Sequence, residues 1–275
     1  LIKLNSLSDA EKKVGVVAAS AGKHAQGVAY HARNLGIPAT IYMPEGTPFT
    51  KVGRTEALGA KVVLSGVGLT EARQAAMEQC ATEKQAFIHP YDDARVIAGQ
   101  GTVGLEFLSD VPDLDTLVVP IGGGGLVAGM AVAVKALQPD IDIIGVEAAL
   151  YPSMSQALGK ATPPPATPGR GGGIGGQTIA EGIAVKEPGE LTQPVITELV
   201  SDIVVVDETA LEMAVQTYLE VQRIVTEGAG AASLAAVLDN PDRFKAKKVG
   251  LVVSGGNMDS RLLSSILMRG LVREG

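Results

Sequence analysis

The chain has 275 residues, a formal net charge of −7 at pH 7, one cysteine and no tryptophan. This length allows one large domain or two modest ones, and the acidic balance argues against binding nucleic acid or anionic membranes. A lone Cys80 excludes a disulfide framework and a cysteine-based metal site, so a reducing cytoplasm is expected. No apolar run is long enough to cross a bilayer, and no secretory signal is recognised.

The first hundred residues alternate between short apolar runs and helical patterns. Strands are predicted at residues 14–19, 40–43, 61–64 and 86–89. Helices are predicted after the polar turn 20–27 through about residue 35, over residues 50–58, and where Ala72, Ala76 and Cys80 share a face. This alternation predicts a parallel sheet with helices on both faces.

The pattern continues in the rest of the chain. Helices are predicted at residues 96–107 and 227–238, with an amphipathic helix around Leu211 and Tyr218. Strands are predicted at residues 143–147, 203–206 and 249–253. The Pro/Gly-rich stretch 162–176, with Arg170 as its one positive charge, is interpreted as a solvated connector.

A glycine loop of Gly122, Gly123, Gly124 and Gly125 separates the apolar run 117–121 from the apolar segment 126–130. Consecutive glycines let backbone N–H groups point toward one place, and the positive end of a following helix adds to that field. The natural ligand is a phosphate group. A flexible linker is the alternative, although linkers are not framed by two apolar segments. The spacing matches neither common nucleotide-binding loop, so it names no nucleotide.

Two other small-residue turns also follow predicted strands, and ligands of parallel α/β sheets bind at such strand ends. In the carboxylate loop, residues 20–26, the side chains of Ser20, Lys23, His24 and Gln26 offer hydrogen-bond donors that suit a carboxylate. The Ser254 turn, residues 254–257, follows the last strand. His24 as an ordinary helix residue and Ser254 as a helix cap are the alternatives.

Six motifs together make the sequence recognisable. They are Ser-Ala-Gly-Lys-His-Ala-Gln-Gly from Ser20, Tyr91-Asp92-Asp93 with Ile-Ala-Gly-Gln-Gly-Thr from Ile97, the glycine loop, Thr-Ile-Ala-Glu-Gly-Ile-Ala-Val from Thr178, Glu-Gly-Ala-Gly-Ala-Ala from Glu227, and Ser-Gly-Gly-Asn from Ser254. In this order, and almost from end to end, the chain resembles the threonine ammonia-lyase (threonine dehydratase)/serine racemase group of fold-type II pyridoxal-phosphate enzymes.

The resemblance implies an α/β fold like that of the tryptophan synthase β chain, with two open parallel-sheet domains and helices on both faces. A small, substrate-closing domain would cover residues 12–99, and residues 1–11 and 100–275 would form the larger cofactor-binding domain. Substrate would bind between them. Members of the group are usually dimers or tetramers, so a homo-oligomer is expected.

The resemblance also implies roles for individual residues. The pyridoxal 5'-phosphate site would comprise Gly122, Gly123, Gly124, Gly125, Leu126, Lys23, Glu227, Ser254 and Gly255, with Ser254 bonded to the pyridine nitrogen. The substrate carboxylate would be held by Ser20, Ala21, Gly22 and His24, and Ser20, Lys23 and His24 would serve the chemistry. Glu181 would lie near the mouth of the site.

The implied reaction is dehydration and deamination of L-threonine, and of L-serine less well, to a 2-oxo acid and ammonia. The cofactor stores the electrons left when the α-proton departs, and the β-hydroxyl is then expelled. A racemase needs a second acid/base, which serine racemases carry as a serine at the second place of the carboxylate loop. Ala21 stands there and cannot transfer a proton, so the lyase is favoured and the racemase is the alternative.

Two departures from the family qualify this reading. The cofactor-binding lysine, carried in a Ser-Phe-Lys-x-Arg-Gly-Ala motif, is expected just upstream of Leu1, and Lys3 lacks its neighbours. The sequence is therefore expected to lack its N-terminal segment, and an inactive cofactor-binding homologue is a rival interpretation. Lys23 replaces an Asn of the family, which predicts reduced or altered activity relative to that Asn.

Two further possibilities stay open. Some relatives bind a divalent cation through a Glu and, six residues on, an Asp; Glu147 is present, but Ser153 takes the second place. Because hard cations prefer carboxylate oxygens, a metal site is not expected, and Glu147 is the one candidate ligand. The other possibility is a nucleotide-binding module that uses the glycine loop without the usual acidic partner.

Overall fold

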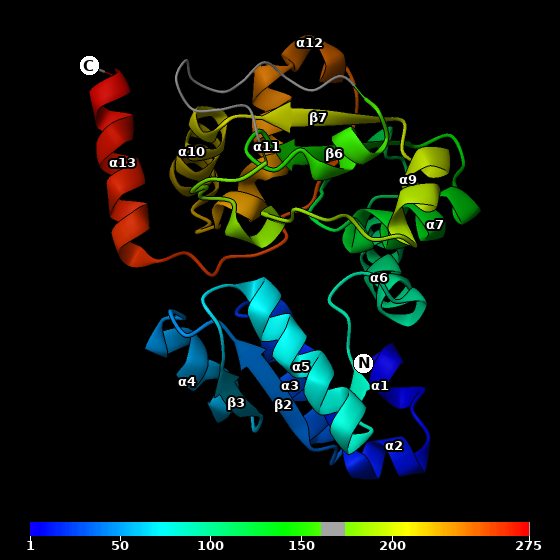
Figure 1. The fold of residues 1–275 in the computed structure, drawn as a ribbon. Coiled ribbons are helices and arrows are strands. Elements are labelled where there is room, and N and C mark those ends of the chain that lie inside the picture. The colour runs from blue at the N-terminus through cyan, green and yellow to red at the C-terminus, as the bar shows by residue number, and fades with distance from the viewer. Residues whose placement is uncertain (161–173, 275) are drawn as a thin grey trace. The chain divides into compact units, whose positions relative to one another are not determined.

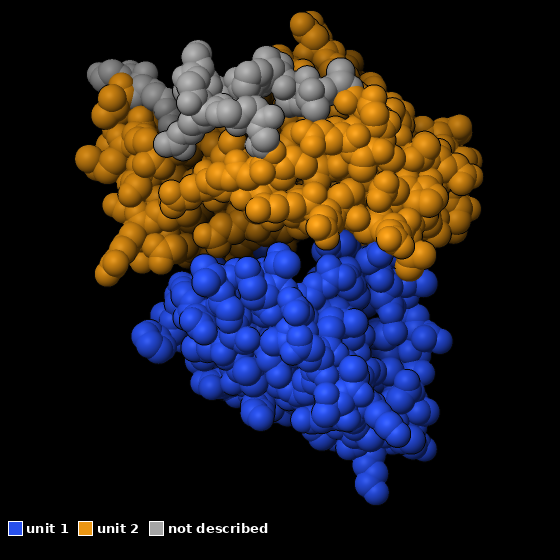
Figure 2. All heavy atoms as spheres, in the orientation of Figure 1, with its two compact units in different colours: residues 1–99 blue, residues 100–275 orange. Residues whose placement is uncertain are grey.

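The structure is a computed structural model that describes residues 1–160 and 174–274. Arg170 and most of the predicted connector 162–176 lie outside the described residues. The chain divides into two compact units, Leu1–Gly99 and Gln100–Gly275 (Figure 2). Within the described part, no helix combines the length and apolar character that a membrane span requires.

The first unit is a parallel sheet of four short strands (Figure 1). The strands are β1 (Val16–Ala19), β2 (Ala39–Met43), β3 (Lys61–Leu64) and β4 (Ala86–Phe87), in the order β3-β2-β1-β4. The helices are α1 (Ile2–Asn5), α2 (Asp9–Val14), α3 (Lys23–Asn34), α4 (Phe49–Ala57) and α5 (Leu69–Glu83).

Strand β1 shows why both faces of this sheet are covered. Val16 and Ala18 pack into one core cluster with Ala25 of α3, whereas Val17 and Ala19 pack into another with Ala72 of α5. Successive side chains of a strand point to opposite faces, so an entirely buried strand needs a helix on each side. The predicted α/β class, with parallel sheets covered by helices, is confirmed.

The start of the chain belongs to this first unit, whereas the resemblance assigned residues 1–11 to the larger domain. Leu4 and Leu7 are 2% and 7% exposed and lie in the same core cluster as Val16. Ser8 and Glu11 form a reciprocal capping box that starts α2. Burial of the two leucines therefore fixes this segment on the first unit.

The second unit repeats the strand arrangement of the first in a separate parallel sheet (Figure 1). Its strands are β5 (Thr116–Pro120), β6 (Asp142–Ala148), β7 (Asp202–Val206) and β8 (Val249–Leu251), in the order β7-β6-β5-β8. Helix α6 (Ala94–Asp110) begins in the first unit and continues into the second. The other main helices are α7 (Gly125–Leu137), α9 (Thr192–Leu199), α10 (Glu208–Thr217), α11 (Gly228–Asp239) and α13 (Ser260–Glu274). Shorter elements are α8 (Ser153–Ala157), η1 (Glu181–Ile183), the π-helical η2 (Tyr218–Gln222) and α12 (Pro241–Phe244).

Small residues let helices approach one another and the sheet in this unit. The buried alanines of α11 join Val118 and Val146 in one core cluster. A Cβ on Gly104 of α6 would lie 2.8 Å from Val134 Cγ2 of α7, so these helices pack almost backbone to backbone. The alanine- and glycine-rich composition thus serves close packing.

Each sheet has one point at which its winding reverses. The chain runs from β1 outward to β3 and then returns to place β4 on the other side of β1, and β5 to β8 follow the same path. Loops that leave neighbouring strands in opposite directions open a crevice at the carboxyl ends, where ligands of open α/β sheets bind. The two candidate crevices therefore lie between β1 and β4 and between β5 and β8.

Candidate active site

The glycine loop lies at the β5–β8 reversal, directly after β5 and before α7. Gly124 has φ +93°, a conformation that side chains rarely adopt, and it forms the N-cap of α7. A Cβ on Gly122 would lie 3.0 Å from Val185 Cγ2 and 3.2 Å from Ile183 Cα. The surroundings of the loop therefore leave little room for a side chain at Gly122, and the backbone conformation disfavours one at Gly124.

Helix α9 holds the back of the glycine loop. The carbonyl of Gly123 accepts a hydrogen bond from the Thr192 hydroxyl at 2.7 Å and another from the Gly189 N–H at 3.0 Å. Thr192 is fully buried. This carbonyl is thereby satisfied by the protein, so the sequence run of four glycines has a fixed orientation and is not a flexible linker.

The front of the loop presents donors. The first N–H groups of a helix have no partner within it, and the macrodipole places positive charge there. Helix α7 is 13 residues long, and Gly125 and Leu126 are its first two residues. The glycine loop and Leu126, predicted to bind the phosphate, thus lie at a helix N-terminus, an arrangement that suits an anion; we call this group the cradle.

The Ser254 turn lies beside this cradle, because β8 pairs directly with β5. The pairing continues past β8, where the Val252 N–H donates to Val118 O at 3.1 Å. Ser233 of α11 then bridges the two strands as they separate, with Oγ 2.8 Å from Val118 O and 3.2 Å from Val252 O. The glycine loop and the Ser254 turn are thus brought together at one reversal point.

Glu227, predicted to lie beside the cofactor ring, has a visible contact in this turn. Its Oε2 accepts a hydrogen bond from the Asn257 N–H at 3.0 Å, and its own N–H donates to Gly255 O at 3.1 Å. Glu227 is also the N-cap residue of α11. Its position next to Ser254 and Gly255 agrees with a place at the cofactor site, and its role toward a ring stays a prediction.

The motif from Thr178 forms a wall that runs between α11 and the glycine loop. Ile179 O lies so close to Gly228 that a Cβ there would be 2.4 Å away, and Ile183 reaches Gly122 at the other end. Glu208 of α10 fixes the start of this wall, since its carboxylate accepts from the Thr178 hydroxyl at 2.6 Å and the Ile179 N–H at 2.9 Å. Glu208 lies outside the recognised motifs, so no pattern in the sequence indicated its role. Glu181 is exposed on the wall.

The carboxylate loop lies at the β1–β4 reversal of the first unit. Ser20 Oγ accepts a hydrogen bond from the Gly22 N–H at 3.1 Å, which leaves the hydroxyl proton for donation. Ala21 and Gly22 are half-buried, and Lys23, exposed, is the first residue of α3. A cation at a helix N-terminus opposes the macrodipole and strengthens the local attraction for an anion.

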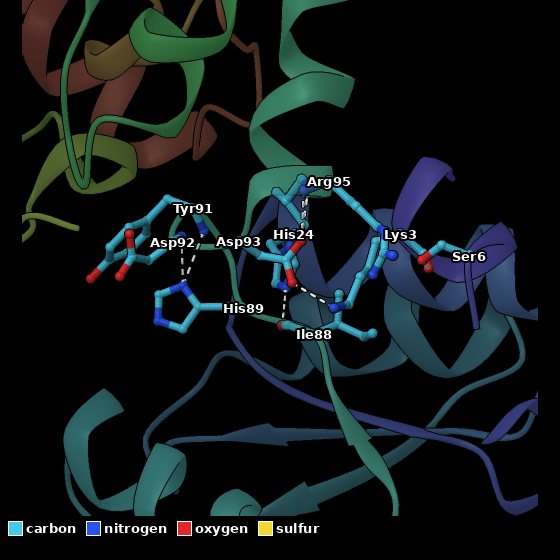
Figure 3. A network of polar contacts seen from close by, with 10 residues as sticks. Lys3, Ser6, His24, Ile88, His89, Tyr91, Asp92, Asp93 and Arg95 are labelled. Carbon is cyan, nitrogen blue, oxygen red and sulfur yellow. Dashed lines mark hydrogen bonds and ion pairs between the residues drawn. The ribbon is translucent and has the colours of Figure 1, made fainter. Parts of the chain in front are cut away.

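His24 connects the two strands at this reversal (Figure 3). Its Nε2 lies 2.8 Å from Ile88 O, and because a carbonyl only accepts, Nε2 carries the proton. Burial lowers the pKa of His24 to about 4. The imidazole is therefore neutral at pH 7, with an acceptor at Nδ1, so charge attraction for a substrate carboxylate must come from other groups of the loop.

This burial predicts a stability that depends on pH. Between the unfolded pKa of roughly 6.5 and the folded value of about 4, the unfolded chain binds a proton at His24 that the native chain does not. The free energy of unfolding is therefore not reduced by His24 above pH 6.5, and it falls by up to about 3 kcal/mol as the pH drops toward 4. We expect the free energy of unfolding, measured with urea, to change less between pH 7 and pH 4.5 in His24→Gln than in the native chain. An unchanged difference would contradict the prediction.

His89, which the motifs did not include, follows β4 and shapes the same crevice (Figure 3). Its Nδ1 accepts from the Asp92 N–H at 2.7 Å and the Tyr91 N–H at 3.4 Å, so its proton resides on Nε2. Burial lowers the pKa of His89. The motif Tyr91-Asp92-Asp93 is thus folded around this imidazole.

Lys3 has a structural partner in the first unit (Figure 3). Its Nζ pairs with Asp93 Oδ2 at 2.5 Å, and both side chains are 18% exposed. The other oxygen of Asp93 accepts from the N–H groups of Arg95 and Val96 at the start of α6. This ion pair gives Lys3 a structural role in the first unit that needs no catalytic function.

Glu147, the one candidate metal ligand, is fully buried at the end of β6. Its two carboxylate oxygens accept three hydrogen bonds, from the Met154 N–H at 2.7 Å, the Ser155 N–H at 2.9 Å and the Ser155 hydroxyl at 2.6 Å. Burial raises the pKa of Glu147, and the three donors oppose that shift. The carboxylate therefore caps α8 and has its oxygens satisfied by protein groups. Within the described ranges, no cluster of three or more potential metal ligands forms.

Comparison with known proteins extends these observations. The family described as pyridoxal-phosphate dependent enzyme matches residues 2–255. An L-threonine ammonia-lyase of Thermotoga maritima is 46% identical over 274 residues, 99% of this chain and 66% of that protein, so the chain spans about two thirds of this relative. The processed form of threonine deaminase isoform 2 from Solanum lycopersicum matches with a TM-score of 0.88 and 34% identity, over 97% of this chain and 76% of that one. Maize serine racemase matches with a TM-score of 0.85 and 35% identity, over 99% and 82%.

These matches bear on the alternatives that the sequence leaves open. They exclude the nucleotide-binding module as an account of the glycine loop, because one family covers nearly all of the sequence. The description of the family names pyridoxal phosphate, which is the cofactor expected at the glycine loop. The chain belongs to the pyridoxal-phosphate-dependent enzyme family.

Proposed function

We propose that the whole protein is an ammonia-lyase that converts L-threonine, and L-serine less well, to a 2-oxo acid and ammonia. The observation that carries the proposal is the glycine loop beside the Ser254 turn at one reversal point, in a chain 46% identical to an L-threonine ammonia-lyase. Fold similarity alone would not choose among the reactions of this family.

The residues of the second unit fit pyridoxal phosphate. A Cβ on Gly124 would meet Thr192 Oγ1 at 2.6 Å, so the loop has no room for a side chain at this position. Its amides and the N-terminus of α7 would hold the phosphate, and the Ser254 hydroxyl would bond the ring nitrogen. When bound, the cofactor supplies an electron sink for the α-carbon of an amino acid.

The carboxylate loop supplies the substrate half of the proposal. The Ser20 hydroxyl and the first N–H groups of α3 would bind the substrate carboxylate, with Lys23 adding positive charge. His24 would act by joining this loop to Ile88 O. The α-proton also needs a base, and the family's lysine motif is not among residues 1–275.

Racemisation is the second candidate, because maize serine racemase matches at 35% identity. A racemase must deliver a proton to the opposite side of the α-carbon, which requires an acid/base side chain there. Ala21 has a methyl group at the place where that family carries a serine. This position favours elimination over racemisation.

The test is an assay of the full-length reading frame that encodes this sequence. We expect 2-oxobutyrate and ammonia from L-threonine, with less turnover of L-serine and no D-serine. Formation of D-serine with no 2-oxo acid would reject the lyase.

The Lys23→Asn variant is expected to differ from the native protein in its affinity for the cofactor and in its rate of turnover. Identical cofactor affinity and rate would reject a special role for Lys23.

We also propose that the protein is a cytoplasmic homo-oligomer, a dimer or tetramer, without nucleic-acid or membrane partners. The family resemblance and the net charge of −7 support this proposal. Light scattering of the purified protein tests the oligomeric state, and a monomer at all concentrations would contradict it.

A further inference from the structure

The Ser254 turn is held by the residues immediately before α11. Thr226 is fully buried, and its hydroxyl lies 3.0 Å from Gly255 O and 3.1 Å from Glu227 O. The same Gly255 carbonyl accepts the Glu227 N–H at 3.1 Å, while the Asn257 N–H donates to the Glu227 carboxylate at 3.0 Å. Gly255 of the turn is therefore hydrogen-bonded to the consecutive residues Thr226 and Glu227, and Asn257 is hydrogen-bonded to Glu227.

Helix α11 approaches this turn as closely as glycine permits. A Cβ on Gly230 would lie 2.4 Å from Gly255 O and 2.4 Å from Thr226 Oγ1. No side chain other than hydrogen fits between the helix and the turn. The Thr226 hydroxyl is thus confined next to the carbonyl that follows Ser254 in the chain.

We infer that Thr226 is a positioning residue, which sets the Ser254 hydroxyl for the cofactor's ring nitrogen. The inference rests on the cofactor assignment and on the proposed role of Ser254. A buried hydroxyl gains little net free energy from a hydrogen bond, but losing its partner leaves a buried acceptor that is under-satisfied. Removing the hydroxyl lets the turn move away from α11, and Ser254 moves with it.

The alternative is that Thr226 only fills space in the core. Thr226→Val keeps the shape and removes the hydroxyl, and Thr226→Ser keeps the hydroxyl. Thr116→Val is the matched control: Thr116 is 1% exposed, and its hydroxyl has no hydrogen-bond partner among the described residues. Replacing an unpartnered buried hydroxyl by a methyl group does not disturb the turn.

The first measurement needs no cofactor. Hydrogen exchange of the peptide that covers residues 253–258 is expected to be about tenfold faster in Thr226→Val, as losing a hydrogen bond of ordinary strength would produce. Thr116→Val and Thr226→Ser are expected to exchange like the native chain. Unchanged exchange in Thr226→Val would overturn the inference.

The second measurement tests the link to the cofactor. Titration with pyridoxal phosphate, followed by absorbance, is expected to give a Kd about tenfold higher for Thr226→Val than for the native chain. In a Ser254→Ala background the same substitution is expected to have no further effect, because the hydroxyl that it positions is gone. An equal loss in both backgrounds, or none in either, would overturn the inference. These titrations use the full-length protein. If the unsubstituted full-length protein took up no pyridoxal phosphate, both the inference and the proposed function would fall, whereas failure confined to the variants affects the inference alone.

Discussion

Substitution of Gly124 by alanine is expected to raise the Kd for pyridoxal phosphate by at least about 100-fold, which corresponds to about 2.7 kcal/mol. The backbone at Gly124 has φ +93°, which costs a side-chain-bearing residue about 1–2 kcal/mol. The added Cβ would also lie 2.6 Å from Thr192 Oγ1 and 2.8 Å from Ile196 Cδ1. Relief of these clashes must move α9 or the loop, and either movement breaks the bond from Thr192 to Gly123 O.

The same variant is expected to lose about 3 kcal/mol of unfolding free energy, measured with urea. Gly53→Ala is the matched control, since Gly53 is an exposed position within α4 where a Cβ would have nothing within 4 Å. Alanine in a helix interior is expected to stabilise the protein by about 0.5–1 kcal/mol and to leave cofactor binding unchanged. Native-like cofactor affinity in Gly124→Ala would show that the phosphate binds elsewhere.

Glu147→Ala is expected to be the most destabilising substitution of a charged residue, with a loss of about 3–5 kcal/mol of unfolding free energy. It removes a fully buried carboxylate and leaves the Met154 and Ser155 N–H groups without their acceptor. Both residues are buried, and unpartnered buried donors are costly.

The control for this prediction is Glu198→Ala, an exposed glutamate on α9 of the same unit. A surface change of this kind stays within about 0.5 kcal/mol. Thermal or urea unfolding measures both variants. A Glu147→Ala variant as stable as Glu198→Ala would show that the cap on α8 is not needed. If a divalent cation raised the stability of the native chain but not that of Glu147→Ala, Glu147 would instead be a metal ligand.

Strands β1 and β2 were predictable because they are buried on both faces. The sequence predicts β2 and β3 to within one residue, since continuous runs such as 61–64 are unambiguous between turn residues. Strand β4 ends at Phe87, two residues earlier than predicted, because Ile88 O accepts from the His24 ring. Helix α9 was not predicted; it contains Pro194 and forms chiefly by packing on α7.

The candidate site was predictable only where the requirements of the backbone are visible as a pattern in the sequence. Four adjacent glycines framed by two apolar segments predict a phosphate loop, and in the structure they lie at a reversal point. The acceptor role of Glu147 had no such signal, because the five residues of α8 show no helical periodicity. Thr226 and Glu208 act on partners 29 and 29–30 residues away, and sequence spacing does not reveal contacts of that range.

In both sheets the fourth strand along the chain lies beside the first, which has a consequence for biosynthesis. As the polypeptide leaves the ribosome from its amino end, β5 and the glycine loop emerge long before β8 can pair with them. The glycine loop and the Ser254 turn can therefore come together only after β8 has left the ribosome. A stalled or prematurely terminated product that ends before β8 would carry the glycine loop without the Ser254 turn, and it would expose the open flank of β5 to misassembly.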